Sequence, residues 1–110
     1  MKKIRVLIAE DHTIVRQGLS ALLRAESDFE VVGEAPDGLE AVEQAKKLTP
    51  DVVLMDIAMK NLNGLDATRK IKKLFPHIKV LALTRYDNEE GIFQILKAGA
   101  SGYFIKDSAM

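Results

Sequence analysis

The stretch Val52-Val53-Leu54-Met55-Asp56 joins four apolar residues to a carboxylate. Thr49-Pro50 stands just before it and stops any preceding helix, because proline lacks the amide hydrogen that a helix interior needs. A short continuous apolar run is typical of a strand covered on both faces, as in a parallel sheet between two layers of helices. The stretch therefore predicts a buried strand with an acidic residue at its carboxyl end.

Similar apolar runs occur before and after this stretch. They are Ile4 to Ala9, which only Arg5 interrupts, Val31-Val32, Ile78 to Leu83, which Lys79 interrupts, and Tyr103-Phe104-Ile105. Segments with helical spacing of apolar residues separate the runs, at Ile14 to Leu23, Leu39 to Leu48, Leu65 to Phe75 and Ile92 to Ala98. The alternation predicts an α/β fold, a flavodoxin-like three-layer sandwich with a five-stranded parallel sheet of order 2-1-3-4-5.

Several polar residues mark where the predicted helices begin. Asp11 or Thr13 is expected to cap the first helix, and Asp37-Gly38 to open the second. After the last predicted strand only Lys106 to Met110 remain, which is too short for a fifth helix. We therefore expect the final helix of the sandwich to be missing from this chain.

The amino-acid composition argues against several classes of protein. The 110 residues suit one domain, and sixteen basic residues balance sixteen acidic ones, so a nucleic-acid-binding role for this segment is not expected. No apolar run reaches the ~18 residues of a membrane span. The absence of cysteine excludes disulfides and thiolate metal sites. We expect a cytoplasmic protein without a membrane association.

Polar side chains follow several predicted strands on the side where open α/β sheets bind ligands. They are Glu10-Asp11, Asp56, Thr84 and Lys106. Converging carboxylates repel one another unless a cation lies among them, and an all-oxygen site suits Mg²⁺. A carboxylate beside Mg²⁺, a lysine and a hydroxyl donor is equipped to attack phosphorus. Asp56 is the central candidate for this nucleophile.

Simpler interpretations exist for each residue taken alone. An aspartate after a strand is commonly a helix cap, and Asp11 alone would be assigned that role. His12 has no second nitrogen or sulfur ligand near it in the sequence, which indicates a capping or surface residue. The joint placement of suitable residues at successive strand ends favours the phosphoryl-transfer interpretation.

The chain resembles the receiver domain of bacterial two-component response regulators, which has the CheY-like form of this sandwich. Within that family it is most similar to the NarL/LuxR type. The resemblance covers Ile4 to Ala109. It is carried by Ile8-Ala9-Glu10-Asp11-His12, Val53-Leu54-Met55-Asp56-Ile57, Leu81-Ala82-Leu83-Thr84 and Lys97-Ala98-Gly99-Ala100-Ser101-Gly102-Tyr103-Phe104-Ile105-Lys106-Asp107.

The resemblance implies a role for each site residue. Asp56 would accept a phosphoryl group from a sensor histidine kinase. Asp11 and Asp56 would bind Mg²⁺, which Mn²⁺ could replace, with Glu10 acting through water and the Ala58 carbonyl completing the ligands.

Three further residues have implied roles around the phosphoryl group. Lys106 and Thr84 would hold its oxygens. Tyr103 would be the aromatic residue whose inward or outward rotamer follows the movement of Thr84.

The same resemblance implies the protein's organisation and partners. Residues 1–110 would be the N-terminal receiver domain of a longer transcriptional regulator whose helix-turn-helix output domain follows Met110. The domain would catalyse only its own phosphorylation and dephosphorylation, and would not act as a conventional enzyme. Phosphorylation-dependent dimerisation would be compatible with this role.

Three residues depart from the family pattern. Lys60 stands where proline is usual, Arg85 follows the threonine where a small residue or methionine is common, and Gly91 replaces a residue that is often large. They affect the expected rates and switching geometry, and none removes a catalytic group.

Three alternative functions remain to be compared. An FMN-binding domain would need a phosphate-binding loop in place of Glu10-Asp11-His12, and a haloacid-type phosphatase would need an aspartate in place of Ala58. A degenerate receiver, acting only as an interaction module, would be expected to lack some of the acidic pair, Asp56, Thr84 and Lys106.

Overall fold

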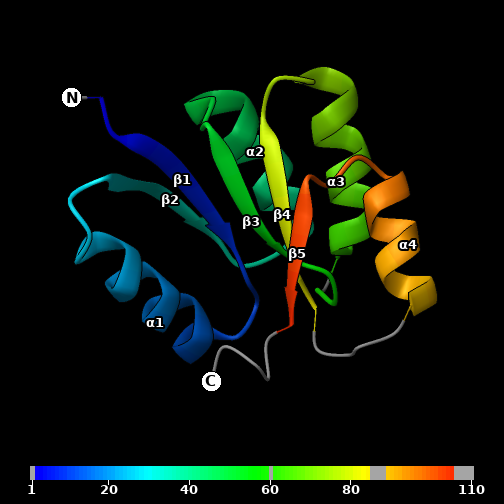
Figure 1. Ribbon diagram of the computed structural model, residues 1–110, viewed down its shortest axis with the longest axis horizontal. Helices are drawn as coiled ribbons and strands as arrows, with labels where there is room; N and C mark the ends of the chain where they lie inside the picture. The colour runs from blue at the N-terminus through cyan, green and yellow to red at the C-terminus, as the bar shows by residue number, and fades with distance from the viewer. Residues whose placement is uncertain (1, 60, 85–88, 106–110) are drawn as a thin grey trace.

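The computed structural model describes residues 2–59, 61–84 and 89–105 (Figure 1). The strands are β1 Ile4–Ala9, β2 Phe29–Ala35, β3 Val52–Asp56, β4 Lys79–Thr84 and β5 Gly102–Ile105. The helices are α1 Thr13–Arg24, α2 Gly38–Leu48, α3 Gly64–Leu74 and α4 Glu89–Lys97. All strand pairs are parallel and the order is β2-β1-β3-β4-β5, which confirms the predicted CheY-like fold.

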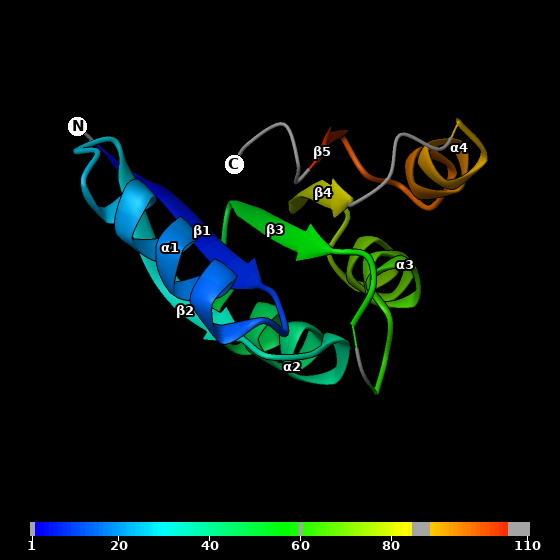
Figure 2. The same ribbon diagram turned by 90° about the horizontal axis from the view of Figure 1, so that it is seen from below.

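Alternating residues of the central strands face two separate cores. Leu7 and Met55 pack into the larger core with α2 and α3, whereas Ile8 packs with Leu19 and Leu23 of α1 on the opposite face. A smaller cluster continues the first face beneath α4, where Ile95 is buried. Figure 2 shows α2, α3 and α4 following one another along that side. Both faces of β1 are therefore covered from Val6 to Ala9, which is why this part of the strand is continuously apolar.

The starts of the helices follow the predictions in part. Asp37 caps α2, because its Oδ1 accepts a hydrogen bond of 2.9 Å from the Glu40 amide. That bond, with further help from Asn61, lowers the pKa of Asp37, since it stabilises the ionised carboxylate. The prediction for α1 was wrong: His12 occupies the N-cap position, and its side chain makes no capping bond.

The described residues contain four helices and end with β5. The expectation of a missing fifth helix concerns residues 106–110, which lie outside the described part of the chain. Among the described residues, no helix has the length and apolar character needed to cross a membrane.

Candidate functional site

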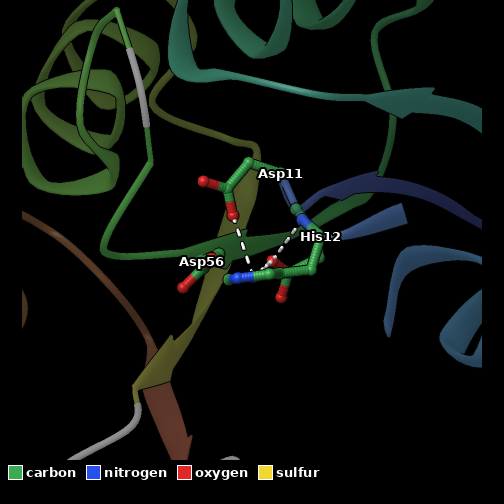
Figure 3. A group of neighbouring side chains, drawn as sticks. Asp11, His12 and Asp56 are labelled. Carbon is green, nitrogen blue, oxygen red and sulfur yellow. Dashed lines mark hydrogen bonds and ion pairs between the residues drawn. The ribbon is translucent and has the colours of Figure 1, made fainter. Parts of the chain in front are cut away.

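Three acidic side chains meet at the carboxyl edge of the sheet. Strands β1 and β3 are parallel neighbours, and Ala9 pairs with Met55. The residues that follow this pair, Glu10 and Asp11 after β1 and Asp56 at the end of β3, therefore emerge side by side. Figure 3 shows Asp11 and Asp56 directed toward the same space. The sequence-based prediction that these carboxylates converge is confirmed.

The cluster is largely shielded from water. The residue exposures of Glu10 and Asp56 are 0% and 3%, and the side chain of Asp11 is 17% exposed. Burying several like charges is costly, because each loses hydration and repels the others. The arrangement therefore fits a divalent cation: hard carboxylate oxygens from two strand ends are the donors that Mg²⁺ prefers.

His12 adds a nitrogen to this cluster. Its Nδ1 lies 3.2 Å from Glu10 Oε2 and 3.2 Å from Asp11 Oδ1, and the ligand atoms of all four residues lie within 4.8 Å of one another. Its backbone amide also donates to Glu10 Oε2 at 3.1 Å. The sequence-based interpretation of His12 as a capping or surface residue is confirmed for its position, since it is the N-cap residue and its side chain is 54% exposed, but it did not anticipate these contacts.

Arg16 is a site residue that the sequence reasoning missed. From the first turns of α1 its guanidinium donates to the Glu10 carbonyl at 2.8 Å and lies 3.4 Å from the carboxylate of Glu34 on β2. These contacts hold the end of β1 between α1 and β2 and bring a positive charge near the acidic cluster. The only sequence signal was an arginine placed early in the helix that follows the acidic pair.

The loop after β3 is held close to Asp56. The Ala58 amide donates to Asp56 Oδ1 at 3.4 Å, and the Gly64 amide donates to the Ile57 carbonyl at 2.8 Å. Farther along the loop, Asn61 adopts a left-handed backbone with φ 66° and donates to Asp37 Oδ2 at 2.7 Å. The loop is thus tied to both α3 and the start of α2. The predicted role of the Ala58 carbonyl stays a prediction.

Thr84 and Tyr103 border a shared hollow. Thr84 is the last residue of β4 and is half-buried, while Tyr103 on β5 is 42% exposed. Both line a small cavity of about 40 Å³ that opens to solvent, together with Ile57 and with Ile92 and Ile95 of α4. Space for movement of either side chain therefore exists beside the end of β4.

Three predicted residues lie outside the described part of the chain. They are Lys106, the expected phosphoryl-binding lysine, and the two departures Lys60 and Arg85. The third departure, Gly91, lies in α4 and lines the hollow beside Thr84.

Comparison with known proteins shows which protein family the chain resembles. The model of the response regulator receiver domain matches residues 6–110. The transcriptional regulatory protein DegU of Brevibacillus brevis is 45% identical over 105 residues, which make up 96% of this chain and 44% of that protein. The chain spans about half the length of the curated relatives it matches.

Solved structures agree with this assignment. The receiver domain of NarL from Mycobacterium tuberculosis has a TM-score of 0.93 and 33% identity, covering 97% of this chain and 86% of that one. CheY of Borrelia burgdorferi, solved with CheX, BeF₃ and Mg²⁺, has a TM-score of 0.88 and 25% identity, covering 93% and 77%. On the sequence match, the fold and the acidic cluster together, this chain belongs to the response regulator receiver domain family, and its relatives are of the NarL/LuxR type.

Proposed function

We propose that this chain is a phosphorylation-controlled switch in which Asp56 accepts a phosphoryl group from a sensor histidine kinase. The convergence of Asp56 with Glu10 and Asp11 at the carboxyl edge of the sheet is the observation that supports this most strongly. Family membership supports the kinase as the donor, because a receiver is the phosphoryl-accepting partner in a two-component system. The reaction is expected to require Mg²⁺, which Mn²⁺ could replace.

The chemistry assigned to Asp56 is nucleophilic. One of its carboxylate oxygens forms a bond to phosphorus, and the bond from phosphorus to the donor's histidine nitrogen breaks. Asp11 and Asp56 would hold the cation, with Glu10 acting through water and the Ala58 carbonyl as a further ligand. When bound, Mg²⁺ neutralises these carboxylates and the negative charge that the phosphoryl group brings.

We assign the structural response to phosphorylation to the hollow beside β4. A phosphoryl group on Asp56 presents strong acceptor oxygens, to which Thr84 and Lys106 would donate. Movement of Thr84 toward Asp56 would enlarge the hollow that Tyr103 already lines. The surface formed by α4 and β5 would then differ between the two states, and partners that prefer one surface would shift the balance between them.

The output is assigned to a part of the protein outside this chain. The relatives are transcriptional regulators, and one similar structure is a DNA-binding response regulator of the LuxR family from Staphylococcus aureus. We therefore propose that residues 1–110 are the N-terminal receiver of a longer transcriptional regulator with a helix-turn-helix output domain. Phosphorylation-dependent dimerisation is part of the same proposal.

Incubation with acetyl phosphate tests the function directly. With Mg²⁺ present, intact-protein mass spectrometry should show a gain of about 80 Da, the mass of one phosphoryl group on a carboxylate nucleophile. Chelation with EDTA should remove the gain, because the clustered carboxylates then repel the anionic donor. No mass gain with Mg²⁺ or with Mn²⁺ would contradict the proposal, as would an equal gain in EDTA.

Thr84→Ala is expected to keep phosphorylation but to uncouple it from Tyr103. The substitution removes the hydroxyl that would move toward the phosphoryl group, and it leaves the acidic cluster intact. NMR of the Tyr103 ring with BeF₃⁻ and Mg²⁺ measures the coupling, with Tyr86→Phe used to assign the two tyrosines. Ser101→Ala, which lies just before β5, serves as the control and should behave as the wild type.

A Tyr103 shift as large in Thr84→Ala as in the wild type would show that the coupling does not pass through Thr84. Arg85 would then be the first residue to replace, since it offers the phosphoryl group another donor.

A further inference from the structure

The proposed function leaves the imidazole of His12 without a role. The residue occupies the N-cap position of α1, but its side chain makes no bond to the helix. Its Nδ1 faces the acidic cluster instead and contacts Glu10 Oε2 and Asp11 Oδ1. A dashed line in Figure 3 marks the contact with Asp11. A nitrogen donor therefore stands among the oxygen donors of the site.

We propose that His12 is a fourth side-chain ligand of this site and gives it a preference for borderline transition-metal ions, such as Zn²⁺, over Mg²⁺. The inference rests on the proposed function in using the same acidic cluster. It goes further in naming a nitrogen ligand and a different class of cation.

The spacing of the donor atoms supports shared coordination. Ligands about 2.1 Å from one ion lie about 3.0 Å apart at right angles and about 3.4 Å apart in a tetrahedron. The two separations of 3.2 Å from His12 Nδ1 fall between these values. The four donors lie within 4.8 Å of one another, so a small turn of one carboxylate brings them within the ~4.2 Å that spans an ion's ligand shell.

The donor chemistry sets the preference. Imidazole nitrogen suits Zn²⁺, Cu²⁺ and Ni²⁺, whereas Mg²⁺ takes oxygen ligands and keeps several waters. Three carboxylates with one histidine form a mixed oxygen and nitrogen set of four ligands, the number that Zn²⁺ takes in proteins. The half-exposed position of His12 at the mouth of the buried cluster leaves its ring accessible to an entering ion.

The test compares wild type, His12→Asn and His77→Asn in Zn²⁺ and Mg²⁺ titrations by calorimetry. Asparagine is a good N-cap residue, so α1 should remain folded in His12→Asn. His77, the second of the two histidines, is exposed in the turn between α3 and β4 and makes a matched control. His12→Asn should lower Zn²⁺ affinity at least about tenfold and leave Mg²⁺ affinity within about threefold, and His77→Asn should change neither.

A second measurement uses the wild type alone. In ¹⁵N NMR of the histidine rings, Zn²⁺ should shift His12 Nδ1 much more than Mg²⁺ does, because Zn²⁺ bonds to the nitrogen whereas Mg²⁺ acts only through the neighbouring carboxylates. Equal Zn²⁺ affinity in His12→Asn, or an Nδ1 shift in saturating Zn²⁺ no larger than that in Mg²⁺, would overturn the inference. In that case Asp56 would still be phosphorylated in Mg²⁺. The inference about His12 can therefore fail while the proposed function holds.

Discussion

Asp56→Asn is expected to abolish the mass gain of about 80 Da that acetyl phosphate and Mg²⁺ produce in the wild type. The amide nitrogen and oxygen of asparagine keep the shape of the carboxylate but are not nucleophiles at neutral pH. The substitution also removes one negative charge from a buried cluster whose members repel one another, so it should not unfold the protein. Intact-protein mass spectrometry and a thermal unfolding curve measure the two effects.

Asp28→Asn is the matched control for that experiment. Asp28 is an exposed aspartate just before β2, at the amino end of the sheet and so at the opposite edge from the cluster. The Asp28→Asn variant should therefore show the same mass gain as the wild type. A mass gain that persists unchanged in Asp56→Asn would place the nucleophile elsewhere, and Asp11 would be the next carboxylate to replace.

Gly64→Ala should destabilise the fold by about 1–3 kcal/mol, the usual cost of forcing extra atoms into a packed region. A Cβ at this first residue of α3 would overlap the carbonyl oxygen of Asp56 and lie 2.7 Å from Ile57 Cα. Both neighbours are backbone atoms at the end of β3, so they cannot rotate away. The strand end that carries Asp56 would have to move. Urea unfolding measures the resulting decrease in the free energy of unfolding.

Gly18→Ala provides a control of the opposite sign. A Cβ on this glycine within α1 would meet no atom within 4 Å. Alanine should therefore stabilise the helix by about 0.5–1 kcal/mol, because glycine loses more backbone freedom on folding. If both variants changed stability in the same direction, the close approach of α3 to β3 would not be what requires glycine at position 64.

The same close approach shows why phosphorylation should respond to Gly64. The amide of this residue donates to the Ile57 carbonyl, and its position sets how near α3 lies to the Asp56 backbone. A displaced strand end would misplace Asp56 relative to Glu10 and Asp11. Gly64→Ala should therefore also slow phosphorylation, whereas Gly18→Ala should leave the rate unchanged.

Local sequence accounted well for the strands with two buried faces. Val6 to Ala9 and Val53 to Met55 are apolar throughout because each residue packs in one of two cores, whereas Arg5 interrupts the first run near its start. The structure places both strands as predicted. Local sequence accounted less well for β2, where only Val31-Val32 was recognised in a strand of seven residues, Phe29–Ala35. The additional residues include Gly33 and Glu34, whose extended conformation comes from pairing with β1 across a register shift.

The acidic residues of the site could be anticipated because a parallel sheet collects its carboxyl ends at one edge. Glu10, Asp11 and Asp56 each follow an apolar run, and strand order alone brings them together. The direction of a side chain beyond the end of a strand depends on its tertiary contacts, which the sequence does not give. The ring of His12 lies against two carboxylates and the guanidinium of Arg16 reaches the Glu10 carbonyl, because attraction between opposite partial charges outweighs the local preference for capping or solvent. The need for glycine at position 64 likewise comes from a contact between α3 and β3, which no local pattern in the chain records.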